Sequence, residues 1–208
     1  MKNIVILISG RGSNMQAIVN AGIPDVRIAA VLSNSAAAAG LAWAAERGIP
    51  TDSLNHKDFA SRGAFDQAMM EKIDAYQPDL VVLAGFMRIL TPEFCTRYEG
   101  RLMNIHPSIL PSFTGLHTHE RALAAGCRVA GCTIHFVTSE LDCGPIISQG
   151  VVPIFDNDTA DDIAARVLKV EHRLFPQAVA DFAAGRLKIE GNRVINSRNQ
   201  PEDRPLLA

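Results

Sequence analysis

The sequence lacks a surplus of charge of either sign, and it lacks a long apolar run. Its 20 lysines and arginines nearly balance its 22 aspartates and glutamates, which leaves a formal net charge of −2. This balance provides no broad basic surface, so we expect neither a nucleic-acid partner nor an anionic membrane partner. The apolar stretch within residues 1–10 is too short to cross a membrane and predicts a buried strand instead. We therefore expect a cytoplasmic protein whose partners are small molecules.

Paired cysteines and internal repeats are also missing. The sequence has four cysteines, Cys95, Cys127, Cys132 and Cys143. No two of them have a Cys-x-x-Cys spacing, so neither a zinc site nor a redox pair is indicated. Cys143 is a poor candidate for a nucleophile, because the adjacent carboxylate of Asp142 raises the pKa of a thiol. We expect one domain over residues 1–195 and a poorly ordered tail over residues 196–208.

Short apolar runs alternate with helical patterns along the chain. Residues 26–32 predict a buried strand, and residues 79–85 form a continuous apolar strand of the kind that parallel sheets bury on both faces. Two further strands, residues 128–137 and 146–154, have no helix between them, which predicts an antiparallel pair. Helical patterns cover residues 36–47, 59–76 and 119–125, and a long helix from residue 158 is expected to kink or restart at Pro176. We predict an α/β fold with a single Rossmann-like open twisted sheet, mostly parallel with an antiparallel extension, and helices on both faces.

A glycine-containing loop, residues 9–14, joins the first strand to a helical pattern for which Ser13 is the expected N-cap. Free N–H groups and the helix dipole at such a junction attract an anion, most often a phosphate. A dinucleotide site needs Gly-x-Gly-x-x-Gly, but Met15 occupies the third glycine position, and residues 33–34 offer no acid for a ribose. We therefore favour a monophosphate, although a simple tight turn would also explain the two glycines.

An amide and an imidazole lie two residues apart near the end of a predicted strand. Alternation places Asn104 and His106 on the same face, and Pro107 should end the strand and release a loop. A neutral donor beside a titratable donor suits an oxygen that gains negative charge during a reaction. The loop of residues 138–145 supplies an acid, Asp142. The alternatives are an amide that completes a turn, a histidine at a sheet edge and an aspartate that shapes a turn.

Three other groups of residues are less specific. Residues 86–90 follow a strand at the edge where open α/β sheets bind ligands, so they could line a flat, partly hydrophobic ligand or simply pack in the core. For Arg62, the default interpretation is a charged side chain in solvent. His117 and His119 could begin a metal site, but the sequence shows no third ligand.

Five motifs together resemble the phosphoribosylglycinamide formyltransferases, the folate-dependent enzymes of purine synthesis. The resemblance covers nearly the whole chain and rests on residues 9–14, 83–90, 104–108, 115–119 and 135–142. One departure is Thr114, where relatives commonly have proline before the glycine. The resemblance implies the formyltransferase fold, cytoplasmic localisation and two small-molecule substrates, and it leaves open whether the protein is a homodimer.

The resemblance also implies roles for individual residues. It assigns the substrate phosphate to Gly12, Ser13 and Asn14, catalysis to Asn104, His106 and Asp142, and a contact with the glycinamide to Glu171. It assigns 10-formyltetrahydrofolate, the cosubstrate, to Arg62, Met87, Arg88, Ile89, Leu90, Thr138, Ser139, Glu140, Leu141 and Asp142. It implies no metal, and it leaves His117 as a residue that is catalytic or merely shapes the site.

The implied reaction agrees with the residues. The substrate amine attacks the formyl carbon, and Asn104 and protonated His106 stabilise the resulting oxyanion, with Asp142 as the partner of His106. A formyltetrahydrofolate hydrolase would carry an extra amino-terminal domain, and a methionyl-tRNA formyltransferase would carry a carboxyl-terminal domain; we expect neither. A noncatalytic nucleotide-binding protein would need the glycine loop but would leave Asn104, His106 and Asp142 unexplained.

Overall fold

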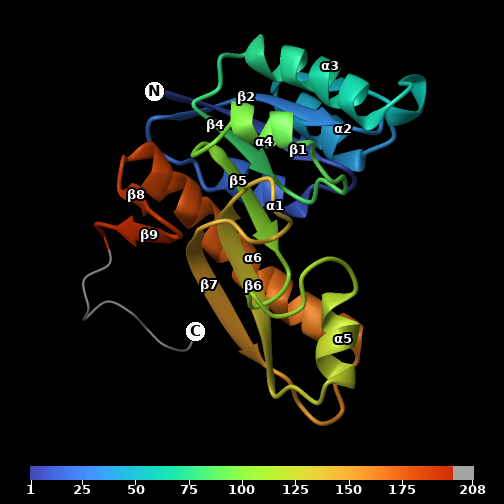
Figure 1. The fold of residues 1–208 in the computed structure, drawn as a ribbon, viewed down its shortest axis with the longest axis vertical. Coiled ribbons are helices and arrows are strands. Elements are labelled where there is room, and N and C mark those ends of the chain that lie inside the picture. The colour runs from blue at the N-terminus through green and yellow to red at the C-terminus, as the bar shows by residue number, and fades with distance from the viewer. Residues whose placement is uncertain (199–208) are drawn as a thin grey trace. The chain divides into compact units, whose positions relative to one another are not determined.

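Strands and helices alternate in the first half of the computed structural model, which describes residues 1–198, whereas β6 and β7, like β8 and β9, follow each other directly (Figure 1). The strands are β1 Lys2–Ile8, β2 Val26–Ser33, β3 Thr51–Ser53, β4 Leu80–Leu83, β5 Leu102–His106, β6 Val129–Phe136, β7 Ile146–Pro153, β8 Leu187–Glu190 and β9 Arg193–Asn196. The helices are α1 Ser13–Asn20, α2 Ala39–Ala45, the 3-10 helix η1 His56–Asp58, α3 Arg62–Asp74, α4 Pro92–Arg97, α5 Thr118–Ala124 and α6 Ala160–Ala183.

The strands follow the order β3-β2-β1-β4-β5-β6-β7-β9-β8 in one sheet. The pairs from β3 to β5 are parallel, whereas β6 with β7 and β8 with β9 are antiparallel. The predicted fold class, a mostly parallel sheet with an antiparallel extension, is confirmed. None of the helices among residues 1–198 is both long and apolar enough to span a membrane.

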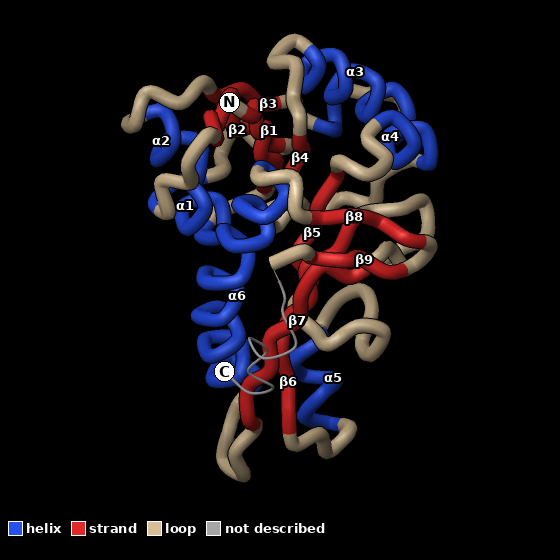
Figure 2. Tube along the Cα trace, turned by 90° about the vertical axis from the view of Figure 1, so that its left-hand side faces the viewer, coloured by secondary structure: helices blue, strands red, loops and turns tan. Residues whose placement is uncertain are grey.

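The chain divides into two compact units, and the first consists of Met1–Asn104 and Val137–Ser139. Figure 2 shows helices on both sides of its strands, with α1 and α2 on one side and α3 and α4 on the other. The apolar stripe of α3 faces the core, where Phe65, Met69 and Ile73 are at most 1% exposed. The helical spacing of these side chains therefore explains how α3 covers the sheet.

The second unit, within the described residues, consists of Ile105–Phe136 and residues 140–198. Its long helix α6 packs against the hairpin of β6 and β7, and Gly150 permits the close approach. A Cβ atom at this glycine would lie 2.3 Å from Val170 and 2.8 Å from Leu174. The helix begins with a capping box in which Thr159 and Asp162 satisfy each other's backbone N–H groups.

Four local predictions differ from the structure. The helix α6 does not restart at Pro176, which is buried, because packing of the surrounding apolar face outweighs the missing N–H. Ser13 is the first residue of α1 and not its N-cap; Gly12 takes that position. The helices expected over residues 36–47 and 59–76 are shorter, as α2 and α3. Asn196 pairs with Leu187 in the terminal hairpin, and residues 199–208 of the expected tail lie outside the described residues.

Candidate functional site

The glycine loop after β1 is shaped by backbone geometry. Gly12 has a φ of 68°, a left-handed conformation that side chains with a Cβ atom rarely adopt. A Cβ atom at this position would also lie 3.0 Å from the Cε atom of Met15 and 3.4 Å from Ile8. The loop leads directly into α1, whose first-turn N–H groups have no intrahelical acceptors. The local chain therefore presents amide groups and the positive end of a helix dipole at one place.

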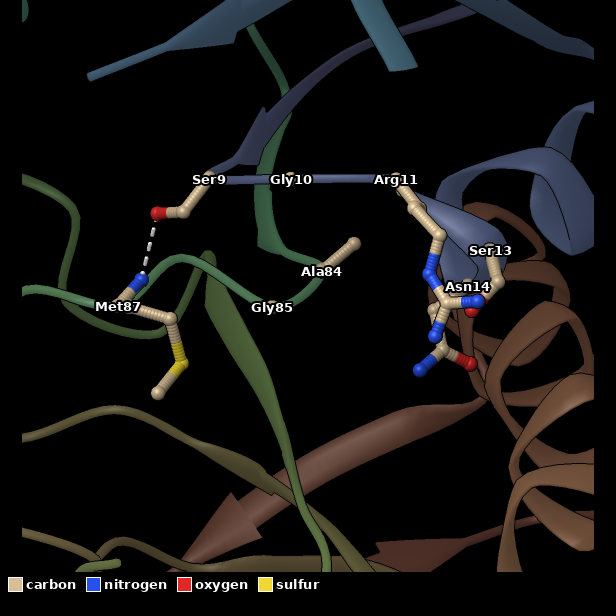
Figure 3. Close-up of a pocket in the computed structure, with 9 residues that line it drawn as sticks. Ser9, Gly10, Arg11, Ser13, Asn14, Ala84, Gly85 and Met87 are labelled. Atoms are coloured by element: carbon tan, nitrogen blue, oxygen red, sulfur yellow. Dashed lines mark hydrogen bonds between the residues drawn. The ribbon is translucent and has the colours of Figure 1, made fainter. Parts of the chain in front are cut away.

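A cavity of about 310 Å³ opens beside this loop in the first unit (Figure 3). It is lined by Ser9, Gly10, Arg11, Gly12, Ser13, Asn14, Ala84, Gly85 and Met87. Ser9 links the glycine loop to the segment that follows β4, the two segments that line the cavity. Its N–H donates to the Gly85 carbonyl at 3.1 Å, and its Oγ accepts from the Met87 N–H at 2.8 Å. The expected phosphate residues Gly12, Ser13 and Asn14 thus share one concave site that suits a small anion.

Arg11 and Ser9 are lining residues that the sequence reasoning missed. Figure 3 shows the Arg11 side chain beside Asn14, across the cavity from Met87. The signal for Arg11 was available in the sequence, since it is a cationic residue between two glycines of an anion loop. Its guanidinium group adds a positive charge to the wall of this cavity.

Strand β5 carries the next two candidates. Asn104, in the first unit, pairs with Leu83 of β4 and is half-buried, whereas its neighbours Met103 and Ile105 are buried. His106, in the second unit, is the last residue of the strand and is 6% exposed. The predicted strand and its end before Pro107 are confirmed.

The imidazole of His106 has two partners within the second unit. Its Nε2 lies 2.9 Å from the carbonyl oxygen of Phe113, and its Nδ1 lies 3.5 Å from Oδ2 of Asp142. The same Oδ2 accepts a hydrogen bond from the Gly115 N–H at 2.9 Å. The side chains of His106 and Asp142 are 8% and 7% exposed, so the carboxylate acts on the ring with little screening by water. The structure therefore brings together the predicted histidine and aspartate.

Hydrogen bonds hold the loop that follows Pro107. Ser108 Oγ donates to the Ser112 carbonyl at 2.6 Å, and Thr133 Oγ1 donates to the Ser108 carbonyl at 2.7 Å. Thr118 Oγ1 donates to the Pro107 carbonyl at 2.7 Å. Sequence reasoning missed these supports, and it missed Phe113 and Gly115, because backbone groups carry no residue-type signal.

The residues expected to contact folate include exposed apolar side chains. Met87 and Ile89 are 66% and 56% exposed in the first unit, and Leu141 is 54% exposed in the second. The Arg88 guanidinium lies 4.4 Å above the Phe65 ring, and its buried Nε has no hydrogen-bond partner among the described residues. Leu90 packs against the core. Asp142 has a buried side chain, and the remaining members of this set are exposed; they are Arg62, Thr138, Ser139 and Glu140.

The other candidates occupy different surroundings. Glu171 is buried in α6, and burial together with the Glu171 charge raises the pKa of Cys132 to about 12. His117 precedes α5, and its side chain is 74% exposed. Its Nδ1 lies 3.5 Å from Oε1 of Glu120. Desolvation and then Glu140 raise the pKa of Cys143, so its thiol is a weaker nucleophile than usual. Residues 1–198 contain no group of three or more side chains that could hold a metal ion.

Comparisons with known proteins agree over most of the chain. The sequence model of the formyl transferase family matches residues 2–179. The chain is 52% identical to the phosphoribosylglycinamide formyltransferase of Escherichia coli (strain K12), over 91% of each chain. It is 44% identical over 91% of its length to the trifunctional purine biosynthetic protein adenosine-3 of Bos taurus, of which it covers 19%. The crystal structure of glycinamide ribonucleotide transformylase 1 from Symbiobacterium toebii matches with a TM-score of 0.91 and 46% identity over 94% of both chains. The chain therefore belongs to the formyl transferase family.

Proposed function

We propose that the protein transfers the formyl group of 10-formyltetrahydrofolate to the amine of 5′-phosphoribosylglycinamide, as a cytoplasmic enzyme of purine synthesis. The observation that carries this proposal is the buried pair of His106 and Asp142, 3.5 Å apart, at the end of the strand that also bears Asn104. A pure binding protein would need only the anion loop. The names of the relatives support the same substrate and the same reaction.

The reaction follows from the roles of three side chains. The lone pair of the substrate amine forms a bond to the formyl carbon, and the electron pair of the carbonyl moves onto its oxygen. Asn104 and protonated His106 stabilise this oxyanion by donating hydrogen bonds, and the Asp142 carboxylate places a negative charge 3.5 Å from the ring. When the intermediate collapses, the carbon–nitrogen bond to the folate breaks. The folate nitrogen gains a proton, and the attacking amine loses one.

Substrate binding uses the rest of the predicted site. The phosphate is assigned to Gly12, Ser13 and Asn14, and we add Arg11 because its side chain lines the same cavity. Glu171 is assigned to the glycinamide. The folate is assigned to Arg62, to residues 87–90 and to residues 138–142, where the exposed Met87, Ile89 and Leu141 offer apolar contact to a flat ring.

Four further parts of the proposal concern the protein as a whole. Residues 1–195 form the formyltransferase domain, the cosubstrate is the folate, and no metal takes part. The partners are small molecules and include neither a nucleic acid nor a membrane, in agreement with the net charge of −2.

An assay for tetrahydrofolate with and without phosphoribosylglycinamide tests the function. We expect tetrahydrofolate and formylglycinamide ribonucleotide in equal amounts, and only when the amine is present. Release of tetrahydrofolate and formate without the amine would indicate a hydrolase instead. Binding of the nucleotide with no folate product would indicate a noncatalytic nucleotide-binding protein.

A further inference from the structure

Both ring nitrogens of His106 face hydrogen-bond acceptors. The Phe113 carbonyl, 2.9 Å from Nε2, can only accept, so Nε2 must carry a hydrogen in this arrangement. On the other side, Nδ1 faces the carboxylate of Asp142 at 3.5 Å. That distance is longer than the 2.7–2.9 Å that is about normal for a hydrogen bond between charged partners. Asp142 therefore acts on Nδ1 mainly through its charge. A hydrogen on Nδ1 remains able to donate to another acceptor.

The position of the Asp142 carboxylate has its own cause. Its Oδ2, the oxygen nearer to Nδ1, accepts a hydrogen bond from the Gly115 N–H at 2.9 Å. Phe113 and Gly115 thus contact the two sides of the same catalytic pair through their backbones. Both residues have left-handed conformations, with φ values of 56° and 76°.

The conformation at Phe113 is costly and is supported by its surroundings. A residue with a Cβ atom is destabilised in the left-handed region because that atom crowds the following carbonyl oxygen, so the loop needs other contacts to hold it there. Arg121 supplies several, because its guanidinium group donates to the Thr114 and Leu116 carbonyls and lies 5.5 Å from the Phe113 ring. Ser112, the residue before Phe113, is held by the hydrogen bond that Ser108 Oγ donates to its carbonyl.

We infer that the backbone from Phe113 to Gly115 is a positioning clamp, which commits Nε2 of His106 to the Phe113 carbonyl and leaves Nδ1 to donate to the formyl oxygen. The inference rests on the proposed function for the identity of that oxygen. The hydrogen on Nε2 stays with the protein throughout the reaction, and only the Nδ1 hydrogen serves the oxyanion. Phe113 and Gly115 act through His106 and Asp142, so they are positioning residues.

Nitrogen NMR of the protein with ¹⁵N-labelled histidine tests the clamp without any substrate. The His106 signals are identified by their loss in His106→Asn, and the pH is raised until the ring is neutral. We expect the remaining hydrogen on Nε2. A neutral ring with its hydrogen on Nδ1 would overturn the inference, even if the protein proves to be an active formyltransferase. The same spectrum with the hydrogen on Nε2 in a protein without transfer activity would overturn the proposed function alone.

A backbone substitution tests the consequence for catalysis. Replacing Thr114 by its α-hydroxy acid turns the Phe113–Thr114 amide into an ester, whose carbonyl is a weaker acceptor. We expect turnover to fall about three- to tenfold with little change in KM, together with a smaller preference for hydrogen on Nε2. The matched control is an ester between Asp156 and Asn157, which are exposed and lie outside the clamp. Unchanged turnover, or lower turnover with an unchanged His106 spectrum, would contradict the clamp.

A side-chain variant provides a second route if the ester cannot be made. Arg121→Gln removes the guanidinium group that supports the loop, whereas Arg128→Gln removes one that pairs with Asp156 on the surface. We expect only Arg121→Gln to lower turnover and to broaden or shift the His106 nitrogen signals. Equal behaviour of the two variants would contradict the support that Arg121 gives.

Discussion

The anion loop of the first unit and the His106 loop of the second are built in opposite ways. The anion loop uses glycine where the backbone turns to the left, as at Gly12, and offers amide groups to a ligand. The His106 loop places Phe113 and His117 in the same left-handed region, and its backbone supports side chains instead. In the proposed function, the first region therefore binds the substrate through the main chain, and the second performs chemistry through side chains. Substitutions should separate binding from turnover accordingly.

The largest effect is expected for His106→Asn. The variant loses the side chain that we propose as a donor to the oxyanion, and removal of one such donor costs roughly a hundred- to a thousandfold in turnover. Steady-state kinetics should show this fall in kcat with a much smaller change in KM for phosphoribosylglycinamide. His56→Asn, at an exposed histidine, is the control. A large rise in KM with normal kcat would assign His106 to substrate binding and would contradict the division between a binding loop and a catalytic loop.

Gly12→Ala should affect the opposite parameter. A Cβ atom at φ 68° strains the loop by about 1–2 kcal/mol and displaces the amides that bind phosphate. We expect KM for phosphoribosylglycinamide to rise about tenfold or more, with a smaller loss of kcat. Gly48→Ala is a matched control, because Gly48 has a φ of 71° and open space around it. If both variants gave the same KM, the loop would be a turn and not an anion site.

Asp142→Asn tests the charge within the catalytic pair. Asparagine retains an oxygen for the Gly115 N–H, so the loop should keep its shape while the buried ring loses its counter-charge. We expect kcat to fall about tenfold, which corresponds to about 1.4 kcal/mol, with KM for both substrates less affected. Asp156→Asn, on the surface, is the control. Near-normal turnover in Asp142→Asn would leave Asp142 as a turn residue.

Acid should destabilise the second unit through its histidines. The pKa of His135 is lowered chiefly by burial, and burial also lowers the pKa of His119 and of His172. The unfolded chain then binds more protons, so stability is lost as the pH falls through about 6.5 and below. In His135→Gln we expect the free energy of unfolding, measured with denaturant, to fall less between pH 7 and pH 5, by on the order of 1 kcal/mol. An unchanged pH slope would contradict this role of His135.

Much of the fold could be predicted because apolar periodicity and burial agree. The strand of residues 102–106, its end before Pro107 and the stripe on α3 follow directly from residue types. The continuation of α6 through Pro176 could not be predicted, because it depends on packing against β6 and β7. The N-cap of α1 could not be predicted either, because the structure places Gly12 at that position and begins the helix at Ser13.

The candidate site was predictable as a set of side chains but not as an arrangement. Alternation along one strand links Asn104 with His106, whereas the pairing of Asp142 with His106 was predicted from the family resemblance and not from spacing; the structure supplies the distance of 3.5 Å. The contribution of Phe113 was hidden as well, because a bulky aromatic residue is not expected at positive φ and its contact is made by the backbone. Roles that depend on main-chain atoms require the structure.

The most direct test compares formyl transfer to phosphoribosylglycinamide with transfer to the same compound without its phosphate, using the unmodified protein. If the anion loop binds the phosphate and the His106 pair catalyses the transfer, kcat/KM should fall at least about a hundredfold for the dephosphorylated compound. That compound has no anion to interact with the amides and the helix dipole of the loop. The rate at saturation should change much less. Equal efficiency with the two compounds would contradict the account, since the cavity beside Gly12 would then have no part in recognising the substrate.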